Sequence, residues 1–509
     1  MNETAIKTNK RILINLMKSI VIVVLSIAIV LFFPHVLNML RFILAKNYHT
    51  DSVLFLGVGN GILNGQKVYT DLFELKTPLI FLTHALSLER FGDLTLITVL
   101  SFLSHITFYV IPMYICLRLE KDWLTKIILS LSALLLSFSL SNYMAWNASP
   151  GLPELFGSAT TLLYVAVMFQ WNKKEFAFSW KHIITSGLLI AISVMWKEPF
   201  LIICIAIALC FLKLNWSYFK VIILSFIFAG IASLLFLAAS GNLSSYFTFY
   251  LPFIFSDRII ADSVLKQAFD FAKIHKYITT YAPFMSITVC VLFLTHLVPN
   301  KKDLKNIVTN TIKTFGILYF LSLSIAIGGF FPQHYIFPVS VLFALFFAAI
   351  EKIKNEYIII IVLSIASLLL CYNTGTDSPV ALKHERILEM QEAGAFNDEI
   401  VTSLGYDEFL YLQGGLDLCY PQKTKLIGPF FFQFNHWFKD KNSRWSKIML
   451  EQIYKANVIV TADAGFELGM LQGYFNIYLK ENFRKVDFAS EFPEVTVPEK
   501  YMAVMYIRK

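Results

Sequence analysis

Residues 48–78 read YHTDSVLFLGVGNGILNGQKVYTDLFELKTP and directly follow the first hydrophobic segment of the chain. Between its apolar runs this stretch carries three acids, Asp51, Asp71 and Glu74, and its second lysine, Lys76, lies close to the closing proline. Charged side chains beside a bilayer cost free energy, so their presence here suggests a functional role. Carboxylates and a lysine this close can serve as general base, metal ligand and phosphate ligand, or they are solvated charges of an ordinary loop.

The composition around this stretch is that of a membrane protein. Of 509 residues, 57% are hydrophobic and 15% are charged, and the mean hydropathy is +0.62. Soluble domains carry about 25% charged residues. The formal net charge of +8 arises from lysines in short loops between apolar runs, which is a topology signal and not the footprint of a nucleic-acid-binding protein.

A membrane-spanning helix needs about 20 mostly apolar residues, and eleven segments are predicted to span. They are 15–38, 94–118, 125–145, 151–171, 182–196, 199–213, 218–240, 284–299, 313–331, 334–351 and 357–373. The basic N-terminus before the first of them, with no small-x-small cleavage site after it, is interpreted as belonging to a retained anchor.

Lysine-rich loops predict the orientation of these segments, because short cytoplasmic loops carry an excess of basic residues. Lysines gather in the short loops at 1–18, 118–126, 172–181, 213–220, 300–313 and 351–356. If these loops are cytoplasmic, the alternation of the spans predicts a cytoplasmic N-terminus and an extracytoplasmic C-terminus. It also predicts that residues 39–93 lie outside the cytoplasm as one continuous loop. The apolar stretch 77–91 then lies at the outer interface as an amphipathic helix. The alternative, in which it is an ordinary second span, would put Arg118, Lys121 and Lys126 outside.

From about residue 373 the composition becomes that of a soluble domain. The chain is therefore divided into a membrane part, 1–372, and an extracytoplasmic α/β part, 373–509. Apolar runs predict strands in the second part, and helical periods predict helices. The predicted strands are 399–404, 423–427, 457–462 and 501–508, and the predicted helices are 380–394, 406–413, 444–455 and 466–481.

The motif D-x(17-20)-Y-x-D-x-F-x-x-K-x-P, from Asp51 to Pro78, resembles the first external loop of the GT-C glycosyltransferases. More narrowly, it is similar to bacterial relatives of protein O-mannosyltransferases and of the lipid A aminoarabinose transferase. Weaker similarities are GGFFPQHYIFPVSVLF at 328–343 and NASPGLPELFG at 147–157. The resemblance implies a multi-spanning enzyme that takes sugar from a polyprenyl-phosphate donor, with a second interfacial helix after the proline of the motif.

The resemblance also implies roles for the acids. Asp51 would be the catalytic base that deprotonates or orients the acceptor hydroxyl. Glu74 or Asp71 would assist it or ligate a metal. The family has its acid immediately before the lysine, whereas Leu75 intervenes here, so which of the two acts stays open. Glu154, in a proline-rich turn that opens a helix, is a further candidate; an acid there also stabilises the helix start.

Basic residues would neutralise the donor phosphate, whose negative charge grows as its bond to the sugar breaks. Lys76 matches the lysine of the family motif, and Lys197 matches a second family lysine. Leu54 stands where family members often have an arginine, so Arg258 in the long loop 241–283 is a third candidate.

His334 and Tyr335 stand between two predicted spans, where a histidine could ligate a metal or donate to phosphate. The sequence leaves open whether a divalent metal takes part; Glu74 and His334 are the residues that could hold it.

The predicted function is an integral-membrane glycosyltransferase of the cell envelope that acts by direct displacement with inversion, because no residue is obviously placed as a covalent nucleophile. Its partners would be a polyprenyl-phosphate-linked sugar, the lipid bilayer and an acceptor that is lipid, glycan or protein. One alternative is a transporter or flippase for lipid-linked glycans, which would need charges inside the spans and an internal repeat. The other is a non-catalytic assembly protein that binds through its C-terminal domain.

Overall fold

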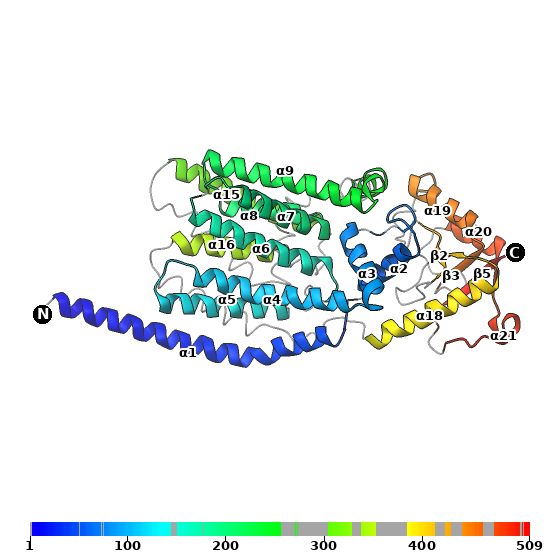
Figure 1. The fold of residues 1–509 in the computed structure, drawn as a ribbon, viewed down its shortest axis with the longest axis horizontal. Coiled ribbons are helices and arrows are strands. Elements are labelled where there is room, and N and C mark those ends of the chain that lie inside the picture. The colour runs from blue at the N-terminus through cyan, green and yellow to red at the C-terminus, as the bar shows by residue number, and fades with distance from the viewer. Residues whose placement is uncertain are drawn as a thin grey trace. The chain divides into compact units, whose positions relative to one another are not determined.

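A computed structural model describes most of the chain (Figure 1). The described residues are 3–49, 51–72, 74, 76–143, 150–175, 177–255, 270, 272, 304–327, 337–352, 384–412, 423–428, 440–461, 473–498, 501 and 503–509. The chain forms two compact units. The first comprises residues 1–45, 99–235 and 263–379, and the second comprises residues 46–98, 236–262 and 380–509.

The first unit is built from apolar helices. They are α1 (Glu3–Leu44), α4 (Thr95–Leu117), α5 (Trp123–Tyr143), α6 (Pro153–Lys173), α7 (Trp180–Trp196), α8 (Phe200–Cys210), α9 (Trp216–Ala239), α15 (Leu304–Ile327) and α16 (Phe337–Lys352). Within the described residues, three stretches are long and apolar enough to cross a membrane: Ile12–Leu44, Thr95–Leu117 and Trp216–Ala239. Helices α7 and α8 are apolar but shorter.

Most predicted spans have helices at the expected positions. The first is longer than the predicted 15–38, because α1 begins at Glu3 and ends at Leu44, with Pro34 inside it. Proline is tolerated in such helices because neighbouring groups satisfy the backbone carbonyl that it frees. The predicted spans 284–299 and 357–373 lie outside the described residues.

Small and hydroxyl side chains bring the helices of the first unit together. Thr161 on α6 and Ser340 on α16 share a hydrogen bond of 2.7 Å. Gly157 lies against the ring of Phe200 on α8, where a Cβ atom would overlap that ring. Close backbone approach and interhelical hydrogen bonds replace the hydrophobic driving force that helices lack inside a bilayer.

Helices α2 (Asp51–Leu63) and α3 (Pro78–Phe91) form a close pair in the second unit. Gly59 allows the approach, since a Cβ atom there would stand 2.8 Å from the backbone nitrogen of Ala85. The helix predicted at 77–91 is confirmed as α3, with Gly92 in the left-handed conformation at its end. Its 14 residues correspond to about 21 Å, less than the roughly 30 Å of a bilayer core. Its interfacial location stays a prediction.

The second unit also contains a short helical segment after α9: α10 (Leu243–Ser245), the π-helix η1 (Tyr246–Tyr250) and α11 (Leu251–Phe253).

The C-terminal part, yellow to red in Figure 1, is an α/β layer as predicted. Its elements are α18 (His384–Ser403), β1 (Glu408–Leu412), β2 (Lys425–Leu426), α19 (Arg444–Lys455), β3 (Val458–Thr461), α20 (Gly473–Asn482), β4 (Phe483–Lys485), α21 (Phe488–Glu491) and β5 (Val504–Arg508). The sheet order is β2-β1-β3-β5-β4. Strand β1 pairs in parallel with β2 and β3, and β5 pairs antiparallel with β3 and β4.

Two local predictions in this part are wrong. The segment 399–404, predicted as a strand, lies almost wholly within α18, and 406–413, predicted as a helix, contains β1. A short apolar run fits a buried strand as well as a helix, and here the pairing of β1 with two neighbours decides. Strand β4 was not predicted. The strands predicted at 423–427, 457–462 and 501–508 and the helix at 444–455 are confirmed.

Candidate active site

Asp51 begins helix α2, where the positive end of the helix dipole stabilises its carboxylate. Its backbone N–H donates to Nδ1 of His49 (3.1 Å), and the N–H of Ser52 donates to the His49 carbonyl (2.9 Å). Because Nδ1 accepts, the neutral ring of His49 carries its proton on Nε2. The Asp51 carboxylate lies 3.8 Å from Nδ1 and its side chain is 29% exposed. It is anchored yet accessible. His49 was not singled out in the sequence, although it stands only two residues before Asp51.

Glu74 and Lys76 are brought together in the loop between α2 and α3. The Lys76 ammonium lies 3.8 Å from the Glu74 carboxylate, and both side chains are largely buried. The same ammonium lies over the ring of Phe55, 5.8 Å from its centroid. Phe55 is one turn after Asp51 on α2, so Lys76 lies against the helix that begins with the candidate base. A partly desolvated ammonium interacts more strongly with an anion than one in open water.

Asp71 has a different surrounding. Its carboxylate accepts from the backbone N–H of Lys67 (2.8 Å), and its own N–H donates to the Lys67 carbonyl (3.0 Å). Such side-chain-to-backbone bonds are typical of turns. The geometry thus gives Asp71 a structural function in the loop and places Glu74 beside Lys76.

Tyr69 supports the same loop and was not predicted as important. It is fully buried and adopts a φ of 74°, a left-handed conformation that costs about 1–3 kcal/mol for a residue with a side chain. Its hydroxyl donates to the carbonyl of Lys76 (2.8 Å). No local sequence signal marks a tyrosine for this conformation.

Glu154 and Lys197 form a buried ion pair within the first unit. Glu154 is in the first turn of α6, and Lys197 ends α7 at the turn that leads into α8. Both residues are at most 5% exposed. The sequence singled out each residue separately, and the fold pairs them.

The remaining candidates, Arg258, His334 and Tyr335, lie outside the described residues, as does most of the loop 241–283. Among the residues that the structure describes, no three His, Cys, Asp or Glu side chains are grouped so that they could hold a metal ion.

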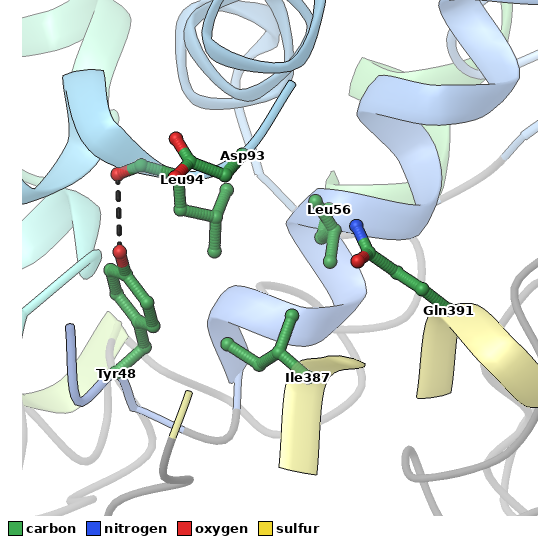
Figure 2. A pocket seen from close by; sticks show the side chains of 6 residues that line it. All are labelled: Tyr48, Leu56, Asp93, Leu94, Ile387 and Gln391. Carbon is green, nitrogen blue, oxygen red and sulfur yellow. Dashed lines mark hydrogen bonds between the residues drawn. The ribbon is translucent and has the colours of Figure 1, made fainter. Parts of the chain in front are cut away.

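A small cleft in the second unit is lined by Tyr48, Leu56, Asp93, Leu94, Ile387 and Gln391 (Figure 2). The Tyr48 hydroxyl donates to the Leu94 carbonyl (3.2 Å) and shares a bond of 2.7 Å with Thr98. Burial raises the pKa of the Tyr48 phenol. Burial would also raise the pKa of Asp93, but the ion pair with Lys46 and hydrogen bonds from Thr95 hold this pKa below its ordinary value. These contacts join the start of the loop to the start of α4.

Comparisons with known proteins bear on the fold. No model of a known protein family matches the sequence, and no curated protein matches it. The structure is similar to a crystal structure of ArnT from Cupriavidus metallidurans bound to undecaprenyl phosphate. The similarity covers 94% of this chain and 97% of that one, with 10% sequence identity and a TM-score of 0.50. The chain therefore has an ArnT-like fold, with apolar helices and a small C-terminal α/β part, as predicted.

Proposed function

We propose that the chain is an integral-membrane glycosyltransferase that transfers a sugar from a polyprenyl-phosphate carrier to an acceptor outside the cytoplasm. The observation that carries this proposal is the similarity, over nearly the whole chain, to an ArnT structure that holds undecaprenyl phosphate. Fold similarity alone does not imply function. The side chains of the first loop supply the second support, because they combine an accessible carboxylate with a partly buried lysine.

In the proposed reaction Asp51 acts as general base. Its carboxylate accepts the proton of the acceptor hydroxyl while the hydroxyl oxygen attacks the anomeric carbon of the sugar. The bond from that carbon to the phosphate oxygen breaks, and the polyprenyl phosphate leaves with the electron pair. A single displacement inverts the anomeric configuration. Attachment of the Asp51 backbone to His49 would hold the base in place at the start of α2.

The leaving phosphate gains negative charge, so it needs a cation that is free to meet it. Lys76 has the better surroundings for this role, because its distance of 3.8 Å from Glu74 is longer than a hydrogen bond. Lys197 is instead paired directly with Glu154. We therefore assign the donor phosphate to Lys76 first, with Arg258 as a further candidate, and Lys197 to the support of α6 and α7.

The proposed orientation follows the lysine bias of the loops. The N-terminus would be cytoplasmic, and the first loop and the C-terminal part would lie outside the cell membrane. The donor would then be bound from the outer leaflet.

The alternative of a transporter or flippase predicts charges in the middle of spans. The buried pair of Glu154 and Lys197 stands in a first turn and just after a last turn, at helix ends. A non-catalytic assembly protein would leave the arrangement of Asp51, Glu74 and Lys76 without a function.

The test is Asp51→Asn in membranes supplied with labelled polyprenyl-phosphate sugars. Asparagine keeps the preference for a helix start, so the fold is retained, and loss of a general base lowers transfer by about 10²–10⁴-fold. Glu89→Gln, an exposed carboxyl on α3, is the matched control and keeps full activity. Undiminished transfer by Asp51→Asn would rule out Asp51 as base.

A wild-type protein that transfers none of the donor sugars would favour the alternatives. The same assay with a chelator tests the metal. Transfer that is lost on chelation and restored by a divalent cation would support the participation of a metal, for which Glu74 and His334 are the proposed ligands.

A further inference from the structure

The C-terminal sheet meets the first loop at one of its edges. Strand β2 ends the sheet, so the N–H and C=O of Leu426 point away from β1. Gln66, just after α2, pairs with both groups: its amide nitrogen donates to the Leu426 carbonyl (2.6 Å), and its amide oxygen accepts from the Leu426 N–H (3.2 Å). A side-chain amide carries the same donor and acceptor as a peptide group, so Gln66 takes the place of a neighbouring strand. Both residues are buried.

The same edge lies against the backbone of the loop. Gly428 follows β2, and a Cβ atom there would overlap the backbone carbonyl of Asp71. Two chain segments more than 350 residues apart are therefore in direct backbone contact, at a position where only glycine fits without a shift.

Aromatic rings form a second connection. Tyr69 of the loop packs on Tyr250 and Tyr246 of η1, with ring centroids 4.6 and 6.0 Å apart. On the same short helical segment, Phe249 and Phe253 pack on Trp445 of α19, at 5.4 and 4.5 Å. The segment after α9 thus lies between the loop and the C-terminal domain. Aromatic pairs in such geometries stabilise a contact beyond the effect of the area that they bury.

Both connections lead to Lys76. Gln66 and Gly428 hold the start and middle of the loop, and Tyr69, held by η1 in a left-handed conformation, donates to the Lys76 carbonyl. A strained residue persists only where its surroundings determine it, and here those surroundings include rings supported by the C-terminal domain.

We propose that the C-terminal α/β domain positions Lys76 for the phosphate of a polyprenyl lipid, with Gln66 and Trp445 as positioning residues. This inference rests on the proposed function and deepens it. Neither residue needs to touch the lipid. They keep the Lys76 ammonium in the position that phosphate binding requires. A cation that adopts many positions binds a phosphate less tightly, because its position must be fixed on binding.

The test measures binding of undecaprenyl phosphate to the purified full-length protein in detergent. Gln66→Met keeps the size of the side chain but removes both hydrogen bonds to Leu426, and Trp445→Ala removes the ring beneath Phe249 and Phe253. We expect each to weaken binding about tenfold, as a partial loss of a charge-assisted contact would.

Trp445→Phe retains an aromatic ring and restores most of the affinity. Thr70→Ala, an exposed position in the same loop, binds as wild type does. In transfer assays the first two variants raise KM for the donor more than they lower kcat.

Wild-type affinity in folded Gln66→Met and Trp445→Ala would overturn the inference, as would a wild-type protein that does not bind undecaprenyl phosphate. Thermal unfolding of each variant identifies one that fails to fold. The lipid affinity of the remaining folded variant then tests the inference. A protein that binds the lipid but transfers no sugar would contradict the proposed function alone, and the affinities of the variants would still judge the inference.

Discussion

The carboxylates of Asp71 and Glu74, three residues apart, have different partners. Asp71 accepts a backbone N–H within its own turn, whereas Glu74 faces the ammonium of Lys76. Two lysines differ in the same way, since Lys197 is in a buried ion pair and Lys76 is not in hydrogen-bond contact with its acid. At the residue scale, therefore, chemical type does not decide the role. What decides the role is whether another group of the protein already forms a hydrogen bond or a direct ion pair with the charged group.

The two acids can be separated by amide substitutions. Asp71→Asn keeps an oxygen that can accept from Lys67, so we expect transfer within about twofold of wild type and a stability loss of about 0.5–1.5 kcal/mol. Glu74→Gln removes the carboxylate beside Lys76 that would assist Asp51, and we expect it to lower transfer tenfold or more. Initial rates in membranes, normalised to protein amount, make the comparison. Equal losses in the two variants would contradict the distinction.

The pair of Glu154 and Lys197 is expected to behave as a structural unit. Glu154→Gln leaves a buried ammonium without its counter-charge and destabilises the protein by about 3–5 kcal/mol. The double variant Glu154→Gln/Lys197→Met is less destabilised than the sum of the two single variants, because no charge stays buried. Unfolding in detergent measures all three. Additive losses would show that the two groups act independently.

At the scale of elements, close backbone approach organises the first loop. Helices α2 and α3 are in close contact at Gly59. Gly428, which follows β2, is in close contact with the backbone of Asp71 in the loop between α2 and α3. Local sequence patterns predict the helices, but they do not predict these backbone contacts. They also misassign 399–404 and 406–413, where the end of α18 and strand β1 have similar apolar runs and only sheet pairing distinguishes them.

Glycine-to-alanine substitutions test this packing. Gly59→Ala forces a Cβ atom against the backbone of α3 and destabilises the protein by about 1–3 kcal/mol. Gly230→Ala on α9 is the matched control, since nothing lies within 4 Å of a Cβ atom there. It is neutral or stabilising, because alanine favours a helix. Thermal unfolding in detergent compares them, and a neutral Gly59→Ala would contradict the tight contact.

At the scale of the whole molecule, two ion pairs stand at the turns that flank the spans. Lys18 on α1 bonds Asp122, just before α5, at 2.8 Å. Lys46, just after α1, pairs with Asp93, just before α4. Burial opposes ionisation of both acids, yet the lysines and threonine donors beside them hold both pKa values below the ordinary value of 3.8. One of these two acid-sensitive connections lies in each unit of the fold.

The pH dependence follows from these lowered pKa values. A carboxyl whose pKa is lower in the folded state contributes stability above its unfolded pKa, and this contribution is lost as the pH falls towards the folded value. The Tm of wild type should therefore exceed that of Asp93→Asn at neutral pH, and the difference should shrink below about pH 4. Asp122→Asn should behave alike, and the two effects should add because the sites share no partner. A Tm difference that is constant with pH would exclude this explanation.

The sequence by itself determined the membrane class, most helix positions and a mostly helical fold with a small C-terminal α/β part. The external location of the loop from Asp51 to Pro78 stays a prediction. Hydropathy, loop charge and a compact motif are local properties, so they can be read without contacts. Only the tertiary structure decided that Gln66 pairs with Leu426, that Glu154 pairs with Lys197, and that Glu74 and not Asp71 lies beside Lys76. These outcomes depend on which distant segments pack together, and packing is settled by shape and hydrogen-bond partners across the fold.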